Sequence, residues 1–149
     1  MRQDGIFDQQ IGFLMWDTER RIAREFAARA SRHGINSGLV PFLRVLEKKD
    51  GLTQQQLADI VTMRSSTTAK ALQQLERLAL IRRQPSASDK RKVDIFLTDN
   101  GRALVKKIAK EAVAMNARLL NGFQKQELDL LRKFLYRMRD NLNSNTLLE

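Results

Sequence analysis

The sequence contains no cysteine and a single histidine, His33. The absence of cysteine excludes disulfide frameworks, thiolate zinc sites, thiol redox sensing and cysteine nucleophiles. One histidine also excludes a site built on a histidine pair. No apolar run approaches the roughly 20 residues that span a bilayer, and the N-terminus (Met1–Gly5) has no hydrophobic signal segment. We therefore expect a soluble cytoplasmic protein that does not associate with membranes.

Residues and motifs that carry out catalysis are equally scarce. The sequence contains no phosphate-binding glycine loop, no nucleophile elbow and no cluster of metal ligands. One histidine and one tyrosine leave little for general acid–base chemistry. We predict that the protein is not an enzyme and needs no cofactor or metal.

The composition is that of a globular protein with a strong positive charge. The chain has 149 residues, enough for one domain with at most a dimerisation appendage, and 42% of them are hydrophobic. Lysine and arginine total 27 against 17 acidic residues, giving a net charge of +10. An excess of this size indicates a polyanionic partner.

Hydrophobic periodicity predicts a mostly helical chain. We expect helices over 7–32, ended by Gly34, over 36–49 with Pro41 in its opening turns, over 54–60, over 65–78, over 99–123 and over 125–142. Thr53 and Gln56 form a Thr-x-x-Gln capping box for the third of these helices, and Thr98 caps the fifth. The tail after Asn143 is expected to fray.

The middle of the chain predicts a winged helix-turn-helix. Two short helices joined by the turn at 61–64 make the helix-turn-helix. Residues 80–83 and 93–97 then read as two strands that flank a polar, basic loop. The expected fold class is mostly α with a small β-wing: a winged helix-turn-helix domain with long N- and C-terminal helices.

Much of the positive charge lies in this motif. Between Arg64 and Lys92 there are eight basic residues opposed only by Glu76 and Asp89, so this stretch holds +6 of the net +10. The second helix of such a motif enters the major groove of DNA, and the wing contacts the backbone or minor groove. Double-stranded DNA is therefore the expected partner.

The predicted DNA contacts lie in the second helix and in the wing. They are Arg64, Ser65, Ser66, Thr67, Thr68 and Lys70 in the helix, with Arg82, Asp89, Lys90, Arg91 and Lys92 in the wing. Asp89 is interpreted as an orienting partner for Arg91 across a tight turn. The alternatives are that Ser65 and Ser66 only cap the helix, that Asp89 only forms a turn, and that Lys90 and Lys92 are solvated loop charges.

These motifs resemble the MarR family of winged-helix transcription regulators. The resemblance rests on Leu52–Ala58, on Leu75–Arg83, on Asp89-Lys90-Arg91 in the wing, and on Leu97–Gly101 opening the next helix, and it covers about 7–142. Ala79 replaces the family's usual glycine, which predicts a recognition helix that ends without a left-handed cap. Ala69 stands where a hydroxyl residue is common.

The resemblance implies a homodimer in which the first helix and the last two interlock. On this reading the 149 residues form a single MarR-like chain, with 36–98 as the DNA-binding region and 7–33 and 99–142 as dimerisation helices. The alternative is that the terminal helices fold back onto their own domain.

The resemblance also implies release of DNA when a small aromatic or phenolic carboxylate binds. The candidate effector residues are Trp16, Arg20, His33 and Phe42, which offer aromatic walls and a cation. The competing interpretations are a core tryptophan, a surface arginine and a histidine that caps a helix end.

The preferred function is a ligand-responsive, sequence-specific repressor that occludes a promoter. Activation by displacing another DNA-bound protein is the other mode. The alternative functions are a nonspecific architectural DNA-binding protein and a winged module whose partner is another protein.

Overall fold

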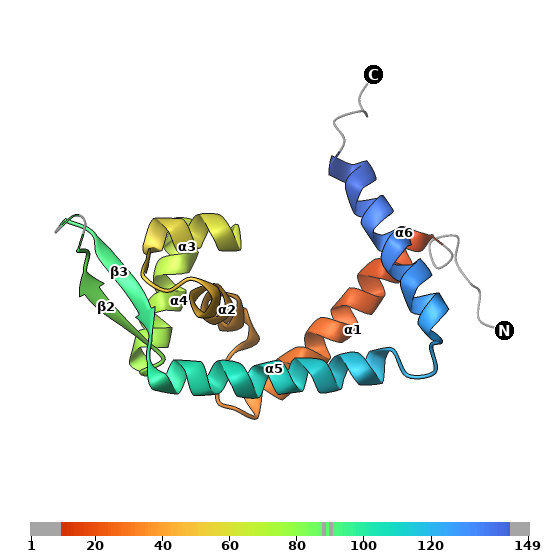
Figure 1. Ribbon diagram of the computed structural model, residues 1–149, viewed down its shortest axis with the longest axis horizontal. Helices are drawn as coiled ribbons and strands as arrows, with labels where there is room; N and C mark the ends of the chain where they lie inside the picture. The colour runs from red at the N-terminus through yellow and green to blue at the C-terminus, as the bar shows by residue number, and fades with distance from the viewer. Residues whose placement is uncertain (1–9, 88, 90, 144–149) are drawn as a thin grey trace, which may run out of the picture. The chain divides into compact units, whose positions relative to one another are not determined.

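The computed structural model describes residues 10–87, 89 and 91–143 of the chain (Figure 1). The chain divides into two compact units, one ending at Met115 and one beginning at Asn116. The predicted start of the first helix at 7, the predicted frayed tail and Lys90 all lie outside the described residues. Among the described residues, no helix is both long and apolar enough to cross a membrane.

The first unit begins with helical elements at the predicted places. Helix α1 spans Ile11–Ser31, the 3-10 turn η2 spans Ser37–Leu39 and α2 spans Val40–Lys48. Gly34 ends α1 with φ +72°, a conformation that costs glycine little. Pro41 lies in the first turn of α2, where its missing N–H has no helical partner to lose.

The helix-turn-helix follows directly. Helix α3 spans Gln54–Val61 and α4 spans Ser65–Arg77. The predicted capping box is confirmed: the Gln56 N–H donates to Thr53 Oγ1 at 3.3 Å, and the Thr53 N–H donates to Gln56 Oε1 at 2.9 Å. These two bonds fix the start of α3.

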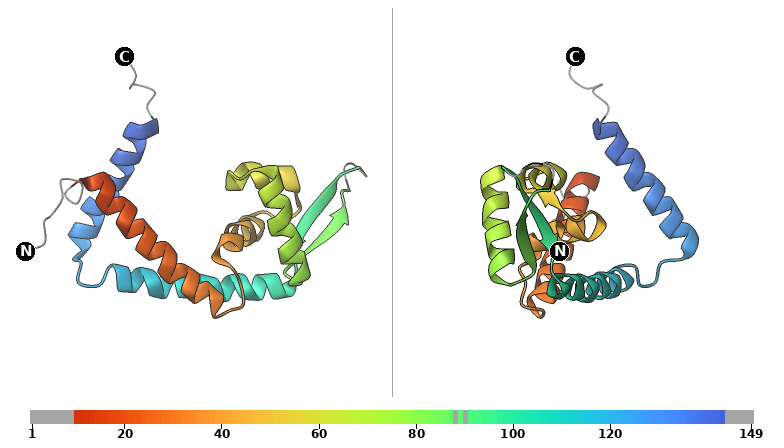
Figure 2. Two further views of the ribbon diagram at one scale, coloured as in Figure 1. Left: turned by 180° about the vertical axis from the view of Figure 1, so that it is seen from behind. Right: turned by 60° about the vertical axis from the view of Figure 1, so that its left-hand side comes forward.

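A three-stranded antiparallel sheet forms the wing. Strand β2 spans Ile81–Pro85 and β3 spans Val93–Leu97, in a register that pairs Ile81 with Leu97. Strand β1, Leu52–Thr53, pairs with the other edge of β3 and was not predicted from the sequence. Figure 1 and the left view of Figure 2 show β2 and β3 as a ribbon that projects beyond the helices, with α4 beside it.

One hydrophobic core holds these elements of the first unit together. Its fully buried side chains come from α2, β1, α3, α4 and β3: Phe42, Leu43, Leu46, Leu52, Leu57, Leu72, Leu75 and Ile95. Burying an aliphatic or aromatic side chain of this size stabilises the fold by about 1.5–3 kcal/mol. The core thus fixes α4 against the sheet.

Helix α5 spans Asp99–Leu119 and starts at the wing. As predicted, Thr98 caps it: Thr98 Oγ1 accepts from the Gly101 N–H at 3.0 Å and donates to the Ala79 carbonyl at 2.7 Å. Val105 and Ile108 are buried in the first unit, whereas Leu119 at the end of α5 is exposed.

The second unit contains the end of α5 and helix α6, Lys125–Asn143. None of the residues in Lys125–Asn143 is buried, and Leu130, Leu131, Phe134, Leu135 and Tyr136 are exposed. The predicted apolar stripe of α6 therefore has no core of its own within the described chain.

Candidate nucleic-acid interface

The N-terminal half of α4 presents small polar and basic side chains to solvent. Arg64, Ser65, Ser66, Thr67 and Lys70 are all exposed. The N-cap residue of α4 is Arg64, and its side chain makes no capping bond. The two serines therefore do not serve as the N-cap, which removes the capping alternative for them. Exposed hydroxyls at a helix start can bond phosphate or base edges, beside the helix N–H groups.

The prediction that Thr68 contacts DNA is wrong. Its side chain is 0% exposed, and its Oγ1 has no hydrogen-bond partner. Thr68 shares the buried face of α4 with Ala71, Leu72 and Leu75, at the three-, four- and seven-residue steps of a helical stripe. It therefore packs into the core and does not contact DNA. The same spacing in the sequence is the signal that places it there.

The wing tip holds Arg91 in a defined position. Asp89 Oδ1 accepts from the Arg91 N–H at 3.0 Å and from Arg91 Nε at 3.2 Å, which confirms the predicted contact between the two residues. The hydrogen bond from the Arg91 side chain lowers the pKa of Asp89 below its usual value, so this carboxylate stays charged. Arg91 remains 90% exposed, and Lys92 beside it is exposed.

Two arginines at the base of the wing contact neighbouring side chains. The guanidinium of Arg82 lies 4.9 Å from the centre of the ring of Phe96, its partner on the neighbouring strand β3, in a cation–π contact. Arg83, which was not among the predicted contacts, pairs with Glu76 of α4 through Nε at 3.1 Å. This ion pair joins α4 to β2. The sequence contained no local signal for it, because the two residues belong to different elements.

The four predicted effector residues do not form one site. Phe42 is 0% exposed in the core of the first unit. The prediction that it forms a wall of the ligand site is therefore wrong. It belongs instead to the apolar stripe of α2. Trp16 is 55% exposed, and the Arg20 guanidinium lies 5.2 Å from its ring centre. Only these two of the four lie together.

His33 belongs to an ion-pair cluster that joins α1 to α5. His33 Nε2 donates to Glu111 Oε1 at 3.1 Å, and Arg29 Nη1 donates to Glu111 Oε2 at 3.1 Å. Arg29 also pairs with Glu25 at 2.9 Å and is only 14% exposed. The hydrogen bond from His33, with the Arg29 pair, lowers the pKa of Glu111. The cluster fixes the end of α1 against α5.

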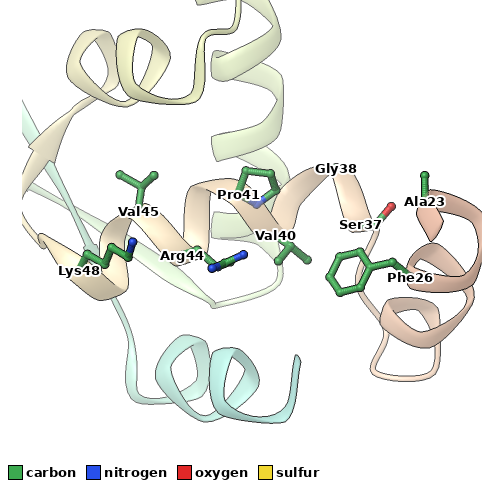
Figure 3. Close-up of a pocket in the computed structure, with 9 residues that line it drawn as sticks. All are labelled: Ala23, Phe26, Ser37, Gly38, Val40, Pro41, Arg44, Val45 and Lys48. Atoms are coloured by element: carbon green, nitrogen blue, oxygen red, sulfur yellow. The ribbon is translucent and has the colours of Figure 1, made fainter. Parts of the chain in front are cut away.

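Clefts beside α2 offer better candidates for a small molecule. One, of about 510 Å³, lies between α1 and α2, with Phe26 on the α1 side and Arg44 and Lys48 on the α2 side (Figure 3). Another, of about 550 Å³, lies between α1, α2 and α5 and also includes Arg44. The first combines an apolar wall with two cations, the arrangement that suits an aromatic carboxylate.

The helix-turn-helix, the wing and the exposed face of α4 together define a winged helix-turn-helix protein. Residues 35–93 match the MarR family. The chain is 30% identical over 111 residues to YdgJ, an uncharacterized HTH-type transcriptional regulator of Bacillus subtilis, over 74% of this chain and 68% of that protein. It is 32% identical over 94 residues to the HTH-type transcriptional regulator PecS of Dickeya dadantii, over 63% of this chain and 57% of PecS.

A solved structure agrees with the sequence matches. The MarR transcriptional regulator from Methanosarcina mazei Go1 superposes with a TM-score of 0.75 at 28% identity, over 89% of this chain and 96% of that one. The chain belongs to the MarR family of transcriptional regulators.

Proposed function

We propose that this regulator binds DNA in a sequence-specific manner as a homodimer and represses transcription by occluding a promoter. The observation that carries the proposal is the exposed polar and basic half of α4, together with Arg91, which Asp89 holds at the wing tip. An α-helix fits the major groove, and an arginine on a projecting ribbon suits phosphate or minor-groove contact. A nonspecific architectural protein would need the charge but not the ordered hydroxyl face.

The experiment that tests this proposal is fluorescence anisotropy on the DNA upstream of the protein's own gene and on a scrambled duplex. A specific regulator should prefer its operator by about 10³-fold or more. Equal and steeply salt-dependent binding to both duplexes would favour the architectural alternative. Binding to neither would favour a protein partner.

Arg91→Ala should weaken binding to both duplexes and lower the salt slope by about one unit, because one phosphate contact is lost. Arg21→Ala is the matched control, since Arg21 is also an exposed arginine paired with a nearby aspartate, Asp17. An unchanged affinity and salt slope for Arg91→Ala would remove the wing tip from the interface.

The dimer is supported by apolar faces that the described chain leaves exposed. Ile11, Leu14 and Trp16 are exposed on α1, and Leu131 and Leu135 are exposed on α6. Faces of this kind mark association surfaces, and two linked DNA-binding modules multiply modest affinities.

Light scattering tests the dimer directly. We expect twice the single-chain mass of 17.2 kDa for the wild-type protein at micromolar concentration. Leu131→Asp with Leu135→Asp should give the single-chain mass, whereas Lys133→Asp on the same helix should not. A wild-type mass near 17.2 kDa would contradict the dimer.

An aromatic carboxylate is the proposed effector, and the cleft between α1 and α2 is its proposed site. Simple aromatic acids should release the protein from its operator. Arg44→Gln should abolish release while leaving DNA affinity within about twofold, because the charge pair with the carboxylate is lost. Arg24→Gln, an exposed arginine of α1 outside the cleft lining, is the control. Release that is identical in the Arg44 and Arg24 variants would exclude this cleft.

A further inference from the structure

A further groove lies between the first turn of α3 and strands β2 and β3 of the wing. Its volume is about 620 Å³. Thr53, Gln54, Gln55 and Gln56 line one side, and Arg83, Lys92, Val93 and Ile95 line the other. The lining includes two cationic side chains and, among the described residues, no carboxylate.

Hydrogen-bond donors face the groove from both sides. The capping box occupies the N–H groups of Thr53 and Gln56, whereas α-helix geometry leaves the N–H groups of Gln54 and Gln55 without a carbonyl partner in the helix. Arg83 lines the groove and donates through Nε to Glu76 Oε2 at 3.1 Å, a bond that restrains its guanidinium. Amide and guanidinium donors of this kind bind phosphate oxygens.

The position of the groove indicates which DNA phosphates these donors would bind. With α4 in a major groove and the wing tip at the adjacent minor groove, one sugar–phosphate strand separates the two grooves. That strand must cross the protein surface between α4 and the wing. Both sides of the groove are joined to α4: α3, whose first turn lines the groove, packs against α4, and Arg83, which lines the other side, pairs with Glu76 of α4.

We propose that this groove seats the DNA backbone between the two contacted grooves, with Arg83 as a direct phosphate contact. The inference rests on the proposed DNA binding and adds Arg83 and the first turn of α3 to the predicted contacts, of which the groove lining includes Lys92. Glu76 then has a defined part: it aims Arg83 in the free protein, and it repels the approaching phosphate. Arg83 and Glu76 should therefore have opposite effects on DNA affinity.

Three variants separate phosphate contact from simple support of the wing. Arg83→Gln should weaken binding to a random-sequence duplex about five- to tenfold and lower the salt slope by about 0.9 unit. Glu76→Gln should strengthen binding two- to threefold, because it removes a negative charge that repels the DNA phosphates. Gln54→Glu should weaken binding about three- to tenfold without lowering the melting temperature, because an acidic residue in the first turn suits the helix dipole.

Asn36→Asp is the matched control for Gln54→Glu. It adds the same charge at another cap position, where the side chain accepts from the Gly38 N–H and an aspartate accepts equally well. Melting temperatures measured for all four variants show that each remains folded.

Parallel weakening by Arg83→Gln and Glu76→Gln would overturn the proposal and assign the pair to wing support alone. A Gln54→Glu effect no larger than that of Asn36→Asp would overturn it as well. Failure of the wild-type protein to bind any duplex would overturn the DNA-binding proposal together with this one. Wild-type binding with unchanged Arg83→Gln and Gln54→Glu variants would overturn the groove alone.

Discussion

Ala79 holds a backbone conformation that alanine disfavours. Its φ is +54°, in the left-handed region that L-residues other than glycine, asparagine and aspartate seldom adopt. The prediction that α4 ends without a left-handed cap is therefore wrong. The cap forms because the Leu80 N–H donates to the Leu75 carbonyl at 3.0 Å and Thr98 Oγ1 donates to the Ala79 carbonyl. These bonds impose the geometry that glycine would adopt freely.

Ala79→Gly should stabilise the protein. The left-handed conformation costs an alanine about 1–2 kcal/mol, and the greater flexibility of glycine in the unfolded chain cancels part of the gain. We expect a net increase of about 0.5–1 kcal/mol in the free energy of unfolding, measured by urea denaturation. A loss of stability would show that the cap bonds fully relieve the strain.

Thr68 carries a second unfavourable feature on the same helix, a buried hydroxyl without a partner. Thr68→Val keeps the branched shape and removes the unsatisfied group, which costs about 1–3 kcal/mol when buried. We expect an increase of about 1 kcal/mol in the free energy of unfolding and unchanged DNA affinity. Thr67→Val, at the exposed neighbour, should change stability by less than about 0.5 kcal/mol. Destabilisation by Thr68→Val would indicate a hydrogen bond to buried water.

At the scale of elements, Gly101 determines how α5 meets the wing. A Cβ at this position would lie 2.1 Å from the Leu80 carbonyl oxygen, which already accepts from the Thr98 N–H. Because the clashing atom belongs to the Leu80 backbone, no side-chain rotation can relieve this clash. The requirement for glycine in the Leu-Thr-x-x-Gly motif is therefore steric.

Gly101→Ala should destabilise the protein by more than about 3 kcal/mol, in the range of severe backbone and overpacking effects. Gly12→Ala in α1, where a Cβ meets nothing within 4 Å, should stabilise the helix by about 0.5–1 kcal/mol. Thermal denaturation should show a lower melting temperature than wild type for Gly101→Ala and a higher one for Gly12→Ala. Equal melting temperatures would show that α5 can shift away from Leu80.

The junction of α1 and α5 predicts acid sensitivity. There, Glu111 pairs with His33 and Arg29, and these two pairs hold the pKa of Glu111 below its ordinary value of 4.5. A carboxyl group with a lowered pKa stabilises the fold above its ordinary pKa, and this contribution is lost as the pH falls through the folded-state pKa. The wild-type melting temperature should therefore exceed that of Glu111→Gln at pH 6, and the difference should shrink below pH 4.5. Asp17 and Asp89 also have lowered pKa values. Because both residues are present in the wild type and in the variant, their contributions cancel in the difference. A difference that stays constant with pH would contradict the ion-pair role.

Elements whose signals are local were predictable from the sequence. The capping box of α3, strand β3, the Thr98 cap and the Asp89–Arg91 contact each depend on residues within three or four positions or on a short alternating run. Features that depend on tertiary packing were not. The Glu76–Arg83 pair and the two-residue strand β1 need the folded arrangement of α4, β2 and β3.

Phe42 shows how one residue can satisfy two patterns. It belongs to an apolar stripe with Leu39, Leu43 and Leu46, and it also supplied an aromatic ring for a predicted effector site. Phe42 lies in the core because this apolar face of α2 packs against the helices and the sheet of the first unit. An aromatic residue within a helical stripe is therefore better interpreted as core, and the effector prediction passes to the exposed Arg44 beside Phe26.

Across the chain, the basic residues and the exposed apolar residues gather in different segments. Eight of the 27 basic residues lie between Arg64 and Lys92, in the elements proposed to contact DNA. The exposed apolar residues of α1 and α6 lie outside that stretch. This division fits a protein with one surface for DNA and another for a second copy of the chain.

The most direct test of this account is selection of bound duplexes from a randomised DNA library by the wild-type protein. A dimeric, sequence-specific regulator should enrich a two-fold symmetric sequence whose half-sites are centred about 10–10.5 base pairs, or a multiple of that spacing, apart. Salt-dependent binding that enriches no sequence would contradict it, because the charged surface would then bind DNA without α4 reading any base.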